Sequence, residues 1–245
     1  SAIDMALADL TARLAGKALA DDGEKRRHNR VEVGVSIGIH PTIDETIAII
    51  DKRLNEGYRR IKLKIKPKWD IELLREVRRQ YPHILLMVDA NSAYTSEHMT
   101  TLQKFDEFGL LMIEQPLDYD DIYQHSLLQP HLDTPICLDE SIHKALALHA
   151  YCLSMGVPMW IGGMLETGIG RAANLIVGGL PGVTLPSDIS ATSRYYDPDI
   201  TDEVFTLNAE DSTIDVPSGP GLGVTVNRER LAAAEAAFNE FPKSA

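Results

Sequence analysis

Four charged residues, Lys64, Asp89, Glu114 and Asp139, follow one another along the chain at intervals of 25 residues. The three acids end short apolar runs such as "LLMVD" and "LLMIE", and Lys64 ends the alternating run "RRIKLK". Apolar runs of this length are typical of strands buried on both faces, and the segments between them have the apolar periodicity of helices. The spacing therefore predicts a repeated strand–helix unit with one charged side chain at each strand end.

Repeated units of this kind extend from residue 31 to residue 202. Strands are expected at 31–39, 59–65, 84–91, 110–116, 135–141, 157–163 and near 183–190, and helices at 42–57, 70–81, 95–109, 168–179 and in a segment that ends at Gly156. This alternation predicts an α/β fold of parallel strands covered by helices, and the number of units favours a closed (β/α) TIM-type barrel. The nucleotide-binding glycine motifs G-x-G-x-x-G and G-x-x-x-x-G-K-[ST] are absent from the expected positions, which disfavours a doubly wound sheet.

The charged residues would meet in such a barrel, because the C-terminal ends of its parallel strands form one mouth. Three carboxylates held together repel one another unless a cation lies among them. Ligation by the oxygens of Asp89, Glu114 and Asp139 predicts Mg²⁺, for which Mn²⁺ can substitute. Isolated acids at strand ends are more often helix caps or surface groups, but three at the same height are hard to explain in that way.

The strand "IKLKIKP" alternates aliphatic residues with Lys62, Lys64 and Lys66. An edge strand with a solvated cationic face is the ordinary explanation of such a pattern, whereas a barrel turns the lysine face into its mouth. A lysine that is close to a metal and partly desolvated can act as a base, which suits removal of a proton alpha to a carboxylate through an enediolate. We therefore expect Lys64 to be the base, Lys62 to orient or neutralise the substrate carboxylate, and Lys66 to be solvated.

Composition and charge exclude several classes of protein. The net charge of −12 argues against nucleic acid as a partner, although a local lysine cluster or a metal still allows a small anionic carboxylate substrate. No apolar run approaches the length of a membrane span, and the first residues lack the layout of a signal peptide. The two cysteines fit neither a disulfide framework nor a zinc site, which favours the cytoplasm. A homo-oligomer is compatible with a barrel that has a helical exterior.

Six segments together resemble the o-succinylbenzoate synthase / N-acylamino acid racemase group of the enolase superfamily, in its muconate-lactonising-enzyme-like subgroup. They are "IKLKIKP", "MVDANSAYT", "IEQPL", "CLDESI", "WIGGMLETGIGRAAN" and "PSDISATSRYY". The resemblance implies Mg²⁺ bound by the three acids, with Lys64 as catalytic base. It also implies that Asn91 and Glu140 support the metal site, that Gly162, Gly163, Met164 and Glu166 line an acyl-substrate pocket, and that Ser190 lies at the mouth of the eighth strand.

The chain departs from this family in two respects. The family has an α+β capping domain, of which residues 1–30 resemble only the final helix and linker; the barrel would then be 31–202, and 203–245 a segment that packs back toward the cap. The family also has a second catalytic lysine at the end of the sixth strand. Here one further step of 25 residues from Asp139 reaches Met164, so about one βα unit, roughly 30 residues, is expected to be missing near 141–146.

Several functions remain open at this point. The main prediction is o-succinylbenzoate synthase, a dehydration in menaquinone biosynthesis that needs one lysine as base and then as acid. The alternative is an N-acylamino acid (N-succinylamino acid) racemase, which needs a base on each face of the alpha carbon, and one protein can carry both activities. A muconate-type cycloisomerase, a dipeptide epimerase and a catalytically inactive barrel that only binds its ligand are the remaining candidates.

Overall fold

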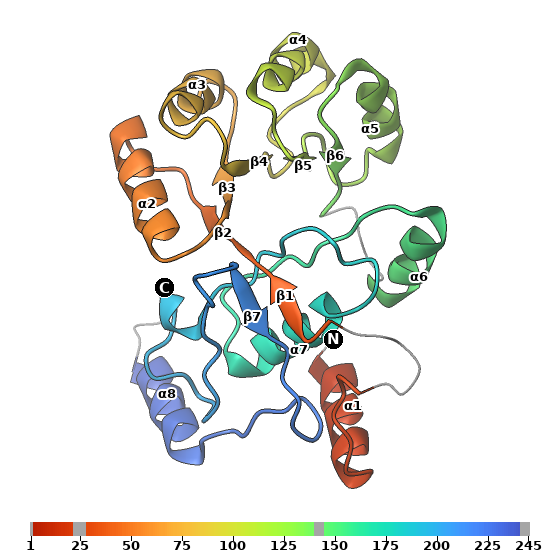
Figure 1. The fold of residues 1–245 in the computed structure, drawn as a ribbon, viewed down its shortest axis with the longest axis vertical. Helices are drawn as coiled ribbons and strands as arrows, with labels where there is room; N and C mark the ends of the chain where they lie inside the picture. Colours follow the sequence, from red (N-terminus) through yellow and green to blue (C-terminus); the bar gives the residue numbers. More distant parts are fainter. Residues whose placement is uncertain (1, 22–27, 140–144, 241–245) are drawn as a thin grey trace. The chain divides into compact units, whose positions relative to one another are not determined.

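The computed structural model describes residues 2–21, 28–139 and 145–240. The chain forms two compact units, which are coloured along the sequence in Figure 1. One unit is continuous, Gly34–Tyr151, and the other combines Ser1–Val33 with Cys152–Ala245. Each unit has its own arrangement of strands and helices, and the residues expected at the metal site belong to the continuous unit.

Five parallel strands form the sheet of the continuous unit. They are β2 (Gly34–Ile37), β3 (Arg60–Lys64), β4 (Leu85–Asp89), β5 (Ile113–Glu114) and β6 (Ile136–Cys137), and they lie side by side in sequence order. Such consecutive parallel pairing, with a helix after each strand, is the repeating pattern of a (β/α) barrel wall. The predicted strands at 59–65, 84–91, 110–116 and 135–141 are therefore confirmed, although the hydrogen-bonded parts are shorter.

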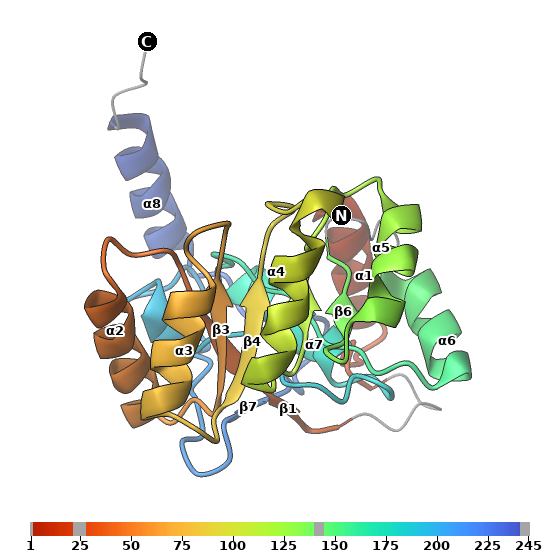
Figure 2. The ribbon, with the colours of Figure 1, turned by 90° about the horizontal axis from the view of Figure 1, so that it is seen from above.

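The helices between these strands all lie on one side of the sheet (Figure 1 and Figure 2). They are α2 (Ile43–Asn55), α3 (Ile71–Gln80), α4 (Met99–Gln103) and α5 (Ile122–Leu128), with short 3₁₀ segments at Ser96–His98, Lys104–Phe108 and Gln129–His131. Helix α2 begins after Thr42, whose side chain accepts a hydrogen bond from the N–H of Glu45, and α3 begins after Asp70, which accepts one from Ile71. These caps agree with the helix starts expected from the sequence.

The core of this unit lies on both faces of the central strands. Ile61 and Leu63 of β3 are buried on one face, and Lys62 is buried on the other. In β4, Leu86, Met87 and Val88 are all buried, so this strand has no solvent-exposed face at its centre. Burial on both faces is what a parallel sheet requires, because helices cover one side and further side chains fill the other.

The discontinuous unit contains less regular structure. Its helices are α1 (Ala2–Leu14), α7 (Gly168–Gly178) and α8 (Arg228–Glu240), and a 3₁₀ turn lies at Thr192–Arg194. Strand β1 (Arg30–Glu32) pairs antiparallel with β7 (Thr213–Asp215). Helix α6 (Ala145–Met155) contains the boundary between the two units at Tyr151. None of the helices in the described ranges has the length and apolar content needed to cross a bilayer.

The structure differs from the sequence expectation at three predicted strands. The expected strand 31–39 is split into β1 and β2, whose partners are β7 and β3. Segments 157–163 and 183–190 form no continuous ladder and meet at a single parallel bridge, Met159 to Val183. Prolines in both segments remove backbone donors, and paired glycines end the first segment, so neither can sustain a ladder. Most of the place expected for a missing βα unit, 140–144, lies outside the described residues.

Candidate metal centre and active site

The parallel register brings charged residues together at the C-terminal edge of the sheet. Lys64 lies opposite Asp89 in the β3–β4 pair, and Asp89 lies opposite Glu114 in the β4–β5 pair. Of the four residues spaced at intervals of 25 positions, Lys64, Asp89 and Glu114 thus end neighbouring strands at the same height. Asp139 lies two residues beyond Cys137, which is opposite Glu114 in the β5–β6 pair. The spacing in the sequence therefore corresponds to a cluster in the fold.

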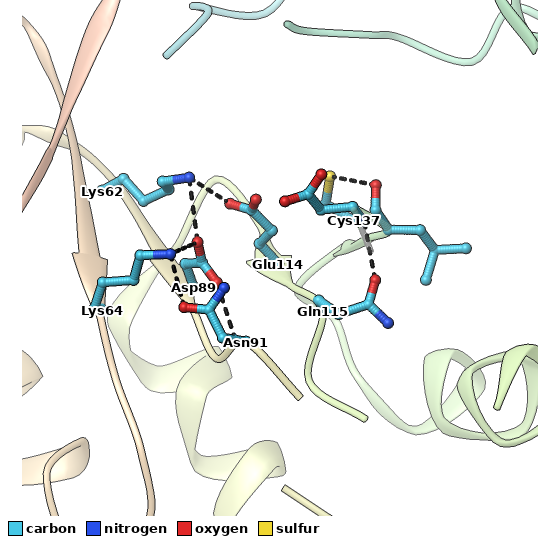
Figure 3. A network of polar contacts seen from close by, with 9 residues as sticks. Lys62, Lys64, Asp89, Asn91, Glu114, Gln115 and Cys137 are labelled. Carbon is cyan, nitrogen blue, oxygen red and sulfur yellow. Dashed lines mark hydrogen bonds and ion pairs between the residues drawn. The ribbon is translucent and has the colours of Figure 1, made fainter. Parts of the chain in front are cut away.

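Two lysines from β3 make ion pairs with the carboxylates of β4 and β5 (Figure 3). Lys62 Nζ lies 3.0 Å from Glu114 Oε2 and 3.2 Å from Asp89 Oδ2. Lys64 Nζ lies 2.6 Å from the same Asp89 oxygen and 2.7 Å from Asn91 Oδ1. The two ammonium groups therefore supply the positive charge that closely spaced carboxylates require.

Strand β3 is not an exposed edge strand, which was the ordinary explanation of its alternating lysines. It pairs with β2 on one side and β4 on the other, and the Lys62 side chain is only 6% exposed. The Lys64 side chain is 32% exposed, so its ammonium group is within reach of a ligand at the sheet edge. Lys66 is exposed, as expected for a residue beyond the strand end. The edge-strand explanation is therefore wrong, and Lys62 and Lys64 lie against the carboxylates at the neighbouring strand ends.

Glu114 is the least satisfied charged group of the cluster. Its pKa is raised to about 8, chiefly by burial and also by the neighbouring carboxylates Asp89 and Asp139, while Lys62 opposes this rise. Its Oε2 accepts from Lys62, but its Oε1 is buried and has no hydrogen-bond partner in the structure. A buried carboxylate oxygen without a donor is costly, and it is a ligand atom that a divalent cation could use.

Asp139 differs from the other two acids because its residue is exposed. Among the described residues, no group of three or more His, Cys, Asp or Glu side chains is close enough to hold a metal ion in the present conformation. The ammonium groups of Lys62 and Lys64 lie against the carboxylates of Asp89 and Glu114. The donor set still fits Mg²⁺, since it consists of carboxylate oxygens, one of which lacks a partner.

Asn91 supports the cluster from the loop after β4. Its backbone N–H donates to Asp89 Oδ1 at 3.0 Å, and its side-chain oxygen accepts from Lys64. Asn91 and Ser92 have positive φ angles of 41° and 61°, a conformation that Asn tolerates better than most residues. This turn aims both groups of Asn91 back at the strand ends, and its role at the metal site stays a prediction.

Gln115 is a site residue that the sequence analysis did not identify. It is completely buried, and its side-chain oxygen accepts a hydrogen bond from the backbone N–H of Asp139 at 2.9 Å. The signal available in the sequence was its place in "IEQP", directly after Glu114 and before a proline. A polar residue enclosed by a buried strand end and a proline must find its partners nearby.

The predicted substrate-pocket residues lie in the discontinuous unit, where three of them are close to one another. The side chain of Glu166 accepts from the N–H of Met164 at 2.7 Å, and a Cβ atom on Gly163 would lie 2.2 Å from the carbonyl oxygen of Asp188. Met164 is 80% exposed and Ser190 is buried. Only glycine fits at position 163, whereas Gly162 has no such neighbour. Glu140 lies outside the described residues.

Known proteins of one family match most of this chain. The family model described as enolase C-terminal domain-like matches residues 45–146 and 141–230. An o-succinylbenzoate synthase of Geobacillus kaustophilus is 45% identical over 262 aligned positions, covering 94% of this chain and 68% of the relative. An N-succinylamino acid racemase of Thermus thermophilus is 44% identical over 251 positions, covering 91% of this chain and 67% of the relative.

A solved structure agrees with these sequence relatives. A member of the enolase superfamily from Listeria innocua superposes with a TM-score of 0.88 at 33% identity, over 95% of this chain and 70% of that one. The expected (β/α) barrel class is therefore confirmed, and the proteins matched are enzymes whose superfamily is generally Mg²⁺-dependent. The chain belongs to the enolase superfamily, in the group of o-succinylbenzoate synthases and N-succinylamino acid racemases.

Proposed function

We propose that the protein removes a proton alpha to a substrate carboxylate with the help of Mg²⁺, and that its main reaction is the dehydration that yields o-succinylbenzoate. The observation that carries this proposal is Lys64 at the end of β3, in register with Asp89, which is in register with Glu114; Lys64 Nζ lies 2.6 Å from Asp89 Oδ2. An amine next to a set of carboxylate ligands is the combination that an enediolate reaction requires.

Asp89, Glu114 and Asp139 would hold the metal, which when bound supplies charge stabilisation for the substrate carboxylate. Lys64 takes the alpha proton at Nζ, and the electron pair left on carbon is delocalised into the carboxylate. The carbon–oxygen bond to the leaving hydroxyl then breaks, and Lys64 returns its proton to that oxygen as water departs. Lys62, which is buried between Asp89 and Glu114, contributes positive charge but has less access to a ligand.

Racemisation of an N-succinylamino acid is the second candidate, because one of the matched relatives carries that name. Racemisation requires proton transfer on both faces of the alpha carbon. Lys62 and Lys64 are two residues apart on one strand, so both side chains project from the same face of the sheet and would approach a bound substrate from one side. This one-sided arrangement favours dehydration, in which the same lysine can act as base and then as acid.

We also infer that this chain lacks one βα unit between β6 and α6, relative to its family. The inference is supported by the family match, which divides into two segments at 141–146, and by the relative whose alignment of 262 positions exceeds the 245 residues of this chain. Within the continuous unit, β6 is the last strand of the sheet, and its two residues are only half-buried. The domain boundaries at 30/31 and 202/203 and a homo-oligomeric state stay predictions.

The substitution Lys64→Ala tests the proposed role most simply. We expect dehydration turnover to fall by about 10²- to 10⁴-fold, the usual contribution of a general base, while Mn²⁺ affinity is retained. Lys66→Ala is the matched control, since Lys66 lies on the same segment but is exposed, and its turnover should stay near that of the unchanged protein. Turnover retained in Lys64→Ala would refute its role, and no turnover in the unchanged protein with Mg²⁺ would favour an inactive, binding barrel.

A further inference from the structure

Gln115 connects the ends of three neighbouring strands. Its backbone N–H donates to the carbonyl of Cys137 at 2.8 Å, and its backbone carbonyl accepts from the N–H of Ser92 at 2.8 Å. Its side-chain oxygen accepts from the N–H of Asp139 at 2.9 Å. One buried residue therefore holds the loop after β4, the end of β5 and the residues after β6.

The hydrogen bond to Asp139 replaces one that the main chain would otherwise make. In a regular parallel ladder, a residue that donates to Cys137 also accepts from the N–H two residues further on, which here belongs to Asp139. Gln115 has a φ of 39°, so its backbone leaves the strand conformation and its carbonyl turns to Ser92 instead. The side-chain oxygen of Gln115 takes over as acceptor for the N–H of Asp139.

The orientation of this amide is fixed by its other end. The Nε2 group of Gln115 lies 3.2 Å from the carbonyl oxygen of Leu117 and 3.5 Å from that of Asp118. Because both partners are acceptors, the nitrogen must face them, and the oxygen must therefore face the N–H of Asp139. The side chain has a defined donor end and a defined acceptor end.

We propose that Gln115 is a positioning residue that sets the backbone of Asp139 so that its carboxylate can join Asp89 and Glu114 around a divalent cation. This inference rests on the metal site put forward under the proposed function. Asp89 and Glu114 are fixed inside a buried ladder, whereas Asp139 is exposed and lies beyond the two-residue strand β6. Octahedral Mg²⁺ tolerates little displacement of a ligand, so the backbone that carries Asp139 needs support.

The chain offers a matched control in Gln129. Its side-chain oxygen accepts from the N–H of Ile136 at 2.7 Å, and its nitrogen donates to the carbonyls of Leu132 and Thr134 at 3.3 Å each. This is the same pattern of one accepted and two donated bonds, but it supports the start of β6 and not the end that leads to Asp139. Substitution of either glutamine should lower the stability of the fold, whereas only substitution of Gln115 should lower the affinity for the metal.

The experiment compares Gln115→Met and Gln129→Met, which keep the length of the side chain and remove its hydrogen bonds. Mn²⁺ binding is measured by electron paramagnetic resonance without substrate, at a temperature where circular dichroism shows each variant folded. We expect Gln115→Met to bind Mn²⁺ about 10- to 100-fold more weakly, as is usual for residues that orient a ligand. Gln129→Met should stay within about twofold of the unchanged protein, although both variants melt at lower temperature.

Each outcome is decisive. Binding by Gln115→Met within twofold of the unchanged protein, or an equal loss in Gln129→Met, overturns the positioning role while leaving the metal site intact. Failure of the unchanged protein to bind Mn²⁺ overturns the proposed metal site and this inference with it. Should Gln115→Met not fold, Gln115→Asn replaces it, because that side chain keeps the amide but is too short to reach the N–H of Asp139, and the same weakening is expected.

Discussion

Glu114 concentrates the electrostatic conflict of the site in one residue. Its side chain is 1% exposed, it faces two other carboxylates, and one of its oxygens has no partner. Burial raises its pKa to about 8 even with Lys62 beside it, so the metal-free protein favours the protonated acid at neutral pH. A divalent cation would remove this conflict by holding the ionised form, so that metal binding and proton release are coupled.

The raised pKa makes a prediction about stability. Between the ordinary value of 4.5 and the folded value of about 8, the folded protein holds a proton on Glu114 that the unfolded chain has lost. The free energy of unfolding of the metal-free protein should therefore decrease as the pH rises through this interval, since stability falls wherever the folded state binds more protons. Urea denaturation in the presence of a chelator, at intervals between pH 5 and about pH 9, measures the trend.

Glu114→Gln provides the control, because its amide does not titrate. Its pH dependence should be clearly flatter than that of the unchanged protein, and its Mn²⁺ affinity should be much lower. An equal slope in both proteins would show that another group causes the dependence.

Strand β2 shows how a single element is fitted into the sheet. Gly34 lies opposite Arg60 of β3, whose side chain is completely buried. A Cβ atom at position 34 would lie 2.2 Å from Arg60 Nε and 2.7 Å from the carbonyl oxygen of Arg60. A glycine is thus required where the Arg60 side chain crosses β2.

The substitution Gly34→Ala should destabilise the protein by about 1–3 kcal/mol, the usual cost of forcing an extra carbon into a packed core. Gly38→Ala tests the same chemical change just beyond the end of β2, where a Cβ atom meets nothing within 4 Å. The free energy of unfolding of Gly38→Ala should stay within about 0.5 kcal/mol of that of the unchanged protein. Thermal or urea unfolding of both variants measures the difference, and equal stabilities would contradict the packing described for Arg60.

The elements were predictable from the sequence to different degrees, for physical reasons. The strands β3, β4 and β5 and their charged ends follow from local patterns, because β4 and β5 lie in continuous apolar runs that end in an acid, and β3 alternates aliphatic residues with lysines. Helices α2 and α3 begin at capping residues visible in the sequence. The segments 157–163 and 183–190 were also predicted as strands, but each contains a proline, the first ends in two glycines and the second is half polar, so they form no ladder.

Within the site, the sequence predicted positions but not contacts. Register alone placed Lys64, Asp89 and Glu114 together, because each ends a strand of the same sheet. The role of Gln115 could not be predicted, since it depends on a positive φ angle that turns its carbonyl away from β6. The two ion pairs of Lys62 likewise depend on how far its side chain reaches across two strands.

At the scale of the whole molecule, the sheet of the continuous unit ends at an incompletely covered strand. Ile136 and Cys137 of β6 are half-buried, and Ile122, Tyr123 and Leu127 on the neighbouring helix α5 are 55%, 69% and 46% exposed. Parallel strands in barrels are normally covered on both sides, and an open edge favours association with other chains. These exposed apolar side chains are what a missing βα unit would leave behind.

Restoring the unit tests this interpretation. We expect that inserting the corresponding βα unit of the Geobacillus kaustophilus relative between residues 139 and 145 raises the melting temperature by several degrees, because apolar surface on β6 and α5 becomes buried. An insert of equal length made of Gly and Ser is the control and should not stabilise the protein. An unchanged or lower melting temperature with the grafted unit would contradict the proposed omission.

The proposed function depends above all on exchange of a substrate's alpha proton by Lys64 at a metal-assisted carboxylate site. Its most direct test follows the alpha proton of an N-succinylamino acid by proton NMR in D₂O, for each enantiomer separately. We expect Mg²⁺-dependent exchange of deuterium into one enantiomer, faster than interconversion of the two enantiomers, and loss of this exchange in Lys64→Ala. Exchange that persists without Mg²⁺ or in Lys64→Ala, or an unchanged protein that neither exchanges this proton nor carries out the dehydration, would contradict the proposed function.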